Sequence, residues 1–368
     1  MKSRLSIPIF ICLFIFSSIA LLASDKTQKQ ESDEITIVAV GDITIGSNFT
    51  PLIEKQGAAI FFEKVESIIQ SADIATASLN TSISDRGEPN PNRDPRFRAA
   101  PGLARAIANA GFDTVSLATP YVMDFGIEAL EDTISNLEWY NVKPIGAGTT
   151  PALANAPKWI KVGSKKIAHL AYLRGNEFNM ASVDPIASAA YSQMMKAVQQ
   201  VEGSAELIIV WLHWGKQNSE EKSRQASIER QRIFAHALID NGADLILCQQ
   251  LHSLGGIEIY NGKPIVYSLA DFIYDKYELQ YARTIIPKVT FVEGSLKSIE
   301  LIPILVNKVG DSVPQPRLLK VRDPEVNTLG EKIEETAIET LKAYQTRCAS
   351  LNTTVEIVGE RGWINGTP

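Results

Sequence analysis

Two segments that each contain a histidine are the parts of this sequence best suited to chemistry. They read Trp211-Leu212-His213-Trp214-Gly215 and Cys248-Gln249-Gln250-Leu251-His252. An imidazole can bind a metal ion or move a proton near neutral pH, so either histidine could serve a functional site. Both segments follow short apolar runs that are typical of buried strands. The second segment places glutamines where a metal site would use histidines, which raises the question of whether a metal is still bound.

Other apolar runs also end in polar residues. Asp42 follows the first run, Asn80 follows the second, and Thr119-Pro120-Tyr121 follow the third. Ligands in layered α/β proteins bind at the carboxyl ends of strands. Each residue alone has a structural explanation: a cap or turn for Asp42 and Asn80, and a core or loop position for the two histidines. Together these strand ends predict one site.

A further group of charged residues is basic. It consists of Arg86, Arg93, Arg96 and Arg98, in a segment rich in proline and asparagine. Because a guanidinium binds carboxylates and phosphates bidentately, this group could bind an anionic ligand. The alternative is a solvated basic loop with no ligand.

Short apolar strands alternate with amphipathic helices along the rest of the chain. We expect strands at 35–40, 74–79, 114–117, 166–172, 207–212, 245–247, 257–260, 265–267, 288–291 and 298–301. We expect helices at 101–111, 127–137, 224–239 and 324–348. The pair Asn261-Gly262 between two strands predicts a hairpin. This alternation predicts a layered α/β fold.

Composition and charge limit the function classes. The chain has 368 residues, 45% of them hydrophobic, and a net charge of −6. It can therefore bury a large core, and it lacks the basic footprint of a nucleic-acid partner. Cys248 and Cys348 form no CxxC motif, so two buried free thiols are expected, with one disulfide as the alternative. The spacing of Cys248 and His252 does not ensure contact, and we expect no catalytic Cys–His pair.

The N-terminus predicts export. Lys2 and Arg4 precede an apolar run at 7–23, which is typical of a signal peptide. The run is also nearly long enough for an uncleaved anchor. Residues 24–34 are polar and are expected to form a tether. We therefore expect the folded part in the periplasm or cell envelope, with membrane contact only through the N-terminal segment.

The motifs from 35 to 275 resemble those of the CapA family, the poly-γ-glutamate capsule biosynthesis proteins. The segments that carry the resemblance are Val40-Gly41-Asp42-Ile43, Phe97-Arg98-Ala99-Ala100-Pro101, residues 111–118, Leu212-His213-Trp214-Gly215 and residues 261–269. The resemblance implies a calcineurin-like metallophosphatase fold, an α/β (α+β) sandwich of two facing mixed sheets flanked by helices. It also implies a metal site and makes Arg98, within its Phe-Arg-Ala motif, the strongest anion-binding candidate.

The sequence departs from the family pattern at the implied metal ligands. Asn80 stands where the family has Glu, Thr119-Pro120-Tyr121 where it has Asn-Asn-His, and 248–252 where it has Gly-His-His-Pro-His. Asp271 stands where the family has Asn. Two dications need several anionic ligands, so a two-metal hydrolase is not expected. The alternative is one divalent ion, Mn, Zn or Mg, on Asp42, His213 and His252.

These observations predict an envelope protein that takes part in biosynthesis, export or anchoring of an anionic polymer such as poly-γ-glutamate. We expect it to bind the polymer or a capsule-synthesis partner protein rather than hydrolyse it. The candidate binding residues are Arg98, Asn80, Gln249, Gln250 and Asp271. The alternatives are a one-metal hydrolase of phosphoesters or γ-glutamyl amides and a purely structural envelope protein. The expected divisions are 1–23 (signal peptide or anchor), 24–34 (tether), 35–306 (CapA-like domain) and 307–368 (extension with one helix).

Overall fold

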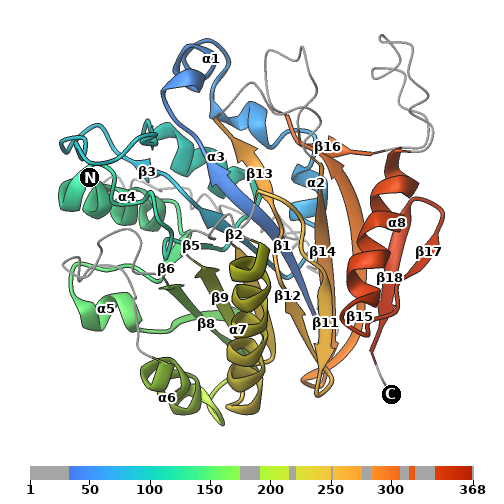
Figure 1. The fold of residues 1–368 in the computed structure, drawn as a ribbon. Helices are drawn as coiled ribbons and strands as arrows, with labels where there is room; N and C mark the ends of the chain where they lie inside the picture. The colour runs from blue at the N-terminus through green and yellow to red at the C-terminus, as the bar shows by residue number, and fades with distance from the viewer. Residues whose placement is uncertain are drawn as a thin grey trace, which may run out of the picture. The chain divides into compact units, whose positions relative to one another are not determined.

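A large mixed sheet forms one layer of the fold. The computed structural model describes residues 33–174, 191–214, 221–249, 252–275, 283–306, 315–319 and 336–366. The strands of this sheet are β1 (Glu34–Thr44), β2 (Ile74–Leu79), β5 (Thr114–Ser116), β6 (Lys143–Ile145), β13 (Asp271–Tyr274), β14 (Arg283–Val292), β15 (Ser295–Leu305), β16 (Arg317–Leu318), β17 (Glu356–Val358) and β18 (Arg361–Asn365). Their order is β17-β18-β15-β14-β1-β2-β5-β6, with β13 beside β1 and β16 beside β15 (Figure 1).

A second, smaller sheet forms the other layer. It contains β7 (Lys158–Val162), β8 (Lys165–Arg174), β9 (Leu207–Trp214), β10 (Leu245–Gln249), β11 (Ile257–Tyr260) and β12 (Lys263–Val266), in the order β11-β12-β10-β9-β8-β7. The predicted hairpin is confirmed: β11 and β12 pair antiparallel, and Asn261 and Gly262 between them both have positive φ. The short strands β3 (Ser82–Ile83) and β4 (Arg98–Ala99) form a separate pair.

Helices cover the sheets (Figure 1). They are α1 (Thr50–Gln56), α2 (Glu66–Ile69), α3 (Gly102–Ala110), α4 (Gly126–Trp139), α5 (Pro151–Asn155), α6 (Tyr191–Val201), α7 (Glu221–Asp240) and α8 (Thr336–Ala349), with the 3₁₀ turns η1 (Ser47–Phe49) and η2 (Ala58–Phe61). As predicted, α3 starts after Pro101 and ends at Gly111, whose left-handed φ of 100° suits glycine. The helix predicted at 127–137 is α4, in which Leu130 and Leu137 are buried and Ile127 in the first turn is 43% exposed.

The main core lies between the two sheets. Ile37 of β1 and Trp211 of β9 belong to the same buried cluster, and Trp211 Nε1 donates to Thr76 Oγ1 of β2 at 3.0 Å. The alternate residues of β9, such as Val210, face a second cluster formed with α6 and α7. Both faces of β9 are therefore buried, which explains its almost continuous apolar sequence. The predicted sandwich of two facing mixed sheets with flanking helices is confirmed.

Some predictions concern residues that the structure does not describe. The signal peptide, the tether as far as residue 32, Gln250 and the expected helix at 324–335 lie outside the described residues. The described part of the C-terminal helix, α8, begins at Thr336. Cys248 and Cys348 are both buried and free, so the expectation of two thiols is confirmed. Within the described residues, no helix is both long enough and apolar enough to cross a bilayer.

Candidate functional site

Two carboxylates lie side by side at the ends of β1 and β13. Val40 pairs with Ala77 of β2 while Asp42 pairs with Ser78, so Gly41 is an extra residue that forms a bulge. Such bulges reorient the following side chain and are frequent beside functional sites. Asp42 is also in register with Asp271 of the parallel strand β13. Both side chains are buried, and we call Asp42 and Asp271 the carboxylate pair.

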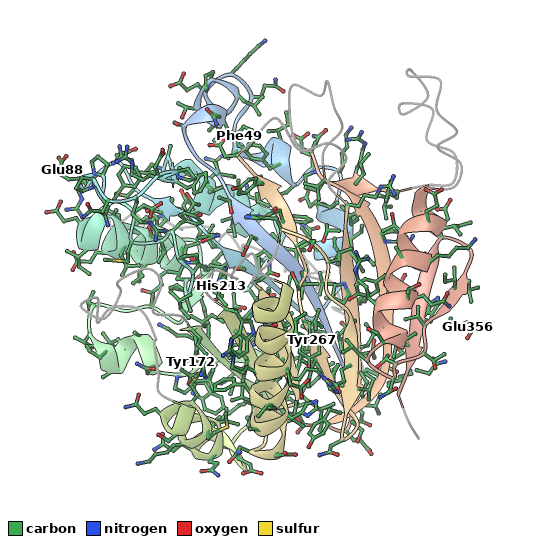
Figure 2. The ribbon with its side chains drawn as sticks, viewed as in Figure 1. Phe49, Glu88, Tyr172, His213, Tyr267 and Glu356 are labelled. Atoms are coloured by element: carbon green, nitrogen blue, oxygen red, sulfur yellow. The ribbon has the colours of Figure 1, made fainter. Side chains whose placement is uncertain are left out.

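His213, labelled in Figure 2, belongs to the smaller sheet and approaches Asp42 of the larger sheet. It lies near the end of β9, and its Nε2 is 3.7 Å from Asp42 Oδ2. Its Nδ1 is 3.1 Å from the carbonyl oxygen of Trp214, which can only accept, so Nδ1 carries a hydrogen. Asp42 Oδ1 and His213 Nε2 are buried and have no hydrogen-bond partner among the described residues. Buried polar atoms without partners are unfavourable, and a cation bound by the two side chains would pair with both.

His252 pairs with the other member of the carboxylate pair. Its Nδ1 lies 2.9 and 3.1 Å from the two carboxylate oxygens of Asp271. Burial raises the pKa of Asp271, the pairing with His252 opposes that change, and the charge of Asp42 adds to it. The His252 side chain is 59% exposed, whereas Asp271 is 4% exposed. A buried carboxylate thus orients an imidazole that is open to solvent.

The two amide residues at the strand ends bind the backbone. Gln249 Nε2 donates to the carbonyl oxygen of Ala270 at 2.9 Å, and Gln249 Oε1 accepts from the amide of Leu269 at 2.8 Å. Asn80 Oδ1 accepts from the amide of Tyr121 at 3.3 Å. Both residues are buried. The structure therefore brings Asn80 and Gln249 to the site, where both hydrogen-bond to loop backbone.

Aromatic rings extend from this region to His252. The ring of Phe97 lies 4.9 Å from that of Tyr121 and 6.0 Å from that of Tyr274, and Tyr274 lies 5.0 Å from His252. Burial raises the pKa of Tyr121, and it raises that of Tyr274 to about 12, with the carboxylate pair adding to both effects. Both phenols are therefore neutral hydrogen-bonding groups at neutral pH.

The four arginines all contact other parts of the protein. Arg98 donates to the carbonyl of Gly87 at 3.2 Å, and its guanidinium lies 4.2 Å from the centre of the Phe125 ring. Arg86 pairs with Asp132, Arg93 pairs with Asp124, and Arg96 donates to the carbonyl of Asn90. Arg86 and Arg96 are the exposed members. The predicted anion-binding role of Arg98 stays a prediction.

Two buried carboxyl groups that were not site predictions lie beside these residues. Asp124 accepts from the amide of Phe97 at 3.0 Å, and burial raises its pKa to about 7 although Arg93 opposes the change. Asp275 accepts from the amide of Asn48 at 3.2 Å, and burial raises its pKa to about 6. Shifts of this kind are frequent at functional sites. The sequence carries no signal for the burial of either residue, because each is buried by segments distant in the chain.

The residues do not fit the two-metal centre that the resemblance implies. The described residues contain no group of three or more His, Cys, Asp or Glu side chains that could hold a metal ion. Gln249 and Asn80 use their amide groups for backbone hydrogen bonds, and His252 Nδ1 binds Asp271. Of the three predicted ligands, Asp42 and His213 approach each other to 3.7 Å, whereas His252 is bonded to Asp271. A typical catalytic zinc site has three protein ligands that converge on the ion.

Comparisons with known proteins agree with the motifs. Residues 36–276 match the family model of the bacterial capsule synthesis protein PGA_cap. The chain is 26% identical over 280 residues to the PGA biosynthesis protein CapA of Bacillus subtilis, covering 74% of this chain and 72% of that one. It is 24% identical over 261 residues to the capsule biosynthesis protein CapA of Bacillus anthracis, covering 68% of this chain and 62% of that one.

Among solved structures, the chain is similar in fold to a putative 5′-nucleotidase from Staphylococcus aureus in complex with alpha-ketoglutarate. The TM-score is 0.44 with 13% identity, over 85% of this chain and 59% of that one. The match to the family model, residues 36–276, extends from β1 to β13 and includes the carboxylate pair, His213 and His252. The chain belongs to the bacterial capsule synthesis protein family PGA_cap.

Proposed function

We propose that this protein takes part in the biosynthesis, export or anchoring of an anionic capsule polymer of the poly-γ-glutamate type, and that it binds the polymer without hydrolysing it. The family to which the chain belongs and the names of its Bacillus relatives support a role with a capsule polymer of this type. The observation that carries the non-hydrolytic role is the use of Gln249: both polar ends of this side chain bind backbone groups. The family pattern has a histidine, a potential metal ligand, at position 249. In this chain Gln249 instead holds the backbone of Leu269 and Ala270.

The polymer would contact the protein through cations and hydrogen-bond donors near the strand ends. His252 is the exposed imidazole of the site. Arg98 begins β4 directly after Phe97, whose ring lies 6.0 Å from that of Tyr274, the aromatic neighbour of His252. Asn80 and Gln249 hydrogen-bond the loop backbone between these groups, and Asp271 binds His252. Gln250 lies outside the described residues and stays a candidate contact from its place in the sequence. The basic and then apolar sequence at 2–23 supports a location outside the cytoplasm, secreted or anchored.

Polymer binding can be measured directly with the full chain and poly-γ-glutamate. Affinity should fall as salt rises, because salt screens the attraction between the polymer and exposed cations. Arg98→Ala should weaken binding about tenfold, since it removes a charge-assisted contact. Arg347→Ala removes the same charge from the exposed face of α8 and is the matched control. Binding that is independent of salt and of Arg98, or no binding, would contradict the proposal.

A metal-dependent hydrolase with one ion is the second candidate function. It is favoured by the buried Asp42 Oδ1 and His213 Nε2, which lack described partners. Elemental analysis of the purified protein separates the two functions, because the hydrolase requires about one Mn, Zn or Mg ion per chain. It also requires hydrolysis of a phosphoester or γ-glutamyl amide that His213→Ala abolishes. Protein that contains no metal and gains no activity with added Mn or Zn excludes this candidate.

A further inference from the structure

Gln249 connects the two sheets at the point where the carboxylate pair forms. It ends β10 of the smaller sheet, in register with His213 of β9. Its side chain crosses to Leu269 and Ala270, the two residues that precede β13 of the larger sheet. The carbonyl oxygen of Ala270 also accepts from the amide of Asp42 at 3.1 Å. The carbonyl oxygen of Ala270 thus accepts one hydrogen bond from each sheet.

The backbone at Ala270 requires such support. Ala270 has a φ of 58°, a left-handed conformation that is unfavourable for alanine. Its own amide donates to Ser268 Oγ at 3.2 Å, and the carbonyl of Leu269 accepts from Thr284 Oγ1. These hydrogen bonds hold the residue that directly precedes Asp271. The direction of the Asp271 side chain follows from the backbone at Ala270.

We infer that Gln249 is a positioning residue that fixes the Leu269–Ala270 backbone and thereby orients Asp271 and its partner His252. The hydrogen bonds of Gln249 carry the structural part of this inference. Its effect on polymer binding rests on the proposed function. Gln249 is 1% exposed and both its polar ends are occupied within the protein. It acts on a bound polymer through His252, the solvent-exposed member of the pair.

Two substitutions test the hydrogen bonds. Gln249→Met keeps the length of the side chain and removes both bonds, whereas Gln249→Glu keeps the acceptor for Leu269 and loses the donor to Ala270. Gln345 supplies the matched control, because its Nε2 donates to the carbonyl of Val355 at 2.7 Å in the C-terminal part of the chain. Gln345→Met removes a similar bond far along the chain from the carboxylate pair.

The first readout is independent of polymer. In the full chain, the ¹⁵N shifts of the His252 ring report its hydrogen bond to Asp271, and amide exchange reports Asp42 and Leu269. Both Gln249 variants should change the His252 ring shifts and speed exchange at Asp42, with a larger effect for Gln249→Met at Leu269. Gln345→Met should change neither. Unchanged ring shifts in the Gln249 variants, or loss of the folded state in both of them, would overturn the inference.

The second readout is a double-mutant cycle on poly-γ-glutamate affinity. Gln249→Met and His252→Gln should each weaken binding about tenfold, and the double variant should bind no more weakly than the weaker single variant. Additive losses would mean that Gln249 acts independently of His252 and would contradict the inference. A wild-type chain that binds no polymer would refute the proposed function alone, because the ring shifts and amide exchange still decide the role of Gln249.

Discussion

At the scale of single residues, burial controls the protonation of the acids around the site. Asp124 is almost fully buried, and its pKa of about 7 results from that burial, with Arg93 only partly compensating. Asp132, on the neighbouring helix α4, shows the reverse: hydrogen bonds from Arg86 and Ser84 lower its pKa. The same side-chain type therefore contributes to stability with opposite dependence on pH.

Asp124→Asn should flatten the pH dependence of stability. The pKa of Asp124 rises from 3.8 unfolded to about 7 folded. The folded state then holds the proton of Asp124 more tightly than the unfolded state does. The stabilisation that this proton gives is complete below pH 4 and is lost as pH rises toward 7. The loss is at most about 4 kcal/mol. Denaturant unfolding between pH 4 and 8 measures it, and asparagine still accepts from Phe97.

Asp132→Asn is the control for that experiment. Because the pKa of Asp132 is lowered in the folded state, its contribution is present above the unfolded pKa and is lost as pH falls. The variant should therefore change the profile only on the acid side. Parallel profiles for Asp124→Asn and the wild type would show that Asp124 does not retain its proton in the folded protein.

The residues that could be predicted from the sequence are those whose role depends on local position. Asp42 and His213 were predicted because each follows an apolar run, and the structure brings them within 3.7 Å. The partners of Gln249 could not be predicted, since Leu269 and Ala270 lie twenty residues later and meet it only when the two sheets face each other. The contacts of Arg98 with Gly87 and Phe125 depend in the same way on tertiary packing.

At the scale of elements, the bulge in β1 depends on a residue without a side chain. A Cβ atom at Gly41 would overlap the carbonyl oxygen of Ala270 and lie 2.8 Å from that of Leu269. Backbone oxygens cannot move aside without breaking the pairing of β1 with β13. Glycine at this position therefore allows β13 to approach and the carboxylate pair to form.

Gly41→Ala should destabilise the protein by about 3 kcal/mol or prevent β13 from pairing with β1. Gly102→Ala is the matched control, because a Cβ there meets no atom within 4 Å and alanine favours the helix α3. The control should leave stability unchanged or raise it by up to about 1 kcal/mol. Urea unfolding of both variants measures the difference. Equal stabilities would mean that β1 and β13 are less closely paired than described.

At the scale of the whole molecule, the sequence predicted most elements but not the order of the large sheet. The strands at 35–40, 74–79 and 114–117 were predicted from continuous apolar runs, and they pair in chain order as β1, β2 and β5. On the other side of β1, however, β14 pairs antiparallel with its first half, and β13 pairs parallel with its last residues. No local pattern encodes those pairings, because they follow from how distant strands cover each other's apolar faces.

The C-terminal part of the chain provides the last prediction. β18 pairs with β15 from Ser298 to Leu301, and α8 buries Leu341, Tyr344 and Cys348. The amide of Ile257, in the smaller sheet, also donates to Cys348 Sγ at 3.3 Å.

A chain that ends at Val306, the predicted domain boundary, should therefore be strongly destabilised. It loses the burial of several large side chains, about 5 kcal/mol or more, which is comparable with the whole stability of a typical domain. It also leaves β15 with an unpaired apolar edge that favours aggregation. Thermal unfolding measured by circular dichroism, with Tyr344→Ala in the full chain as a milder variant, tests this. A shortened chain that unfolds cooperatively at the midpoint of the full chain would instead make 35–306 an independent domain.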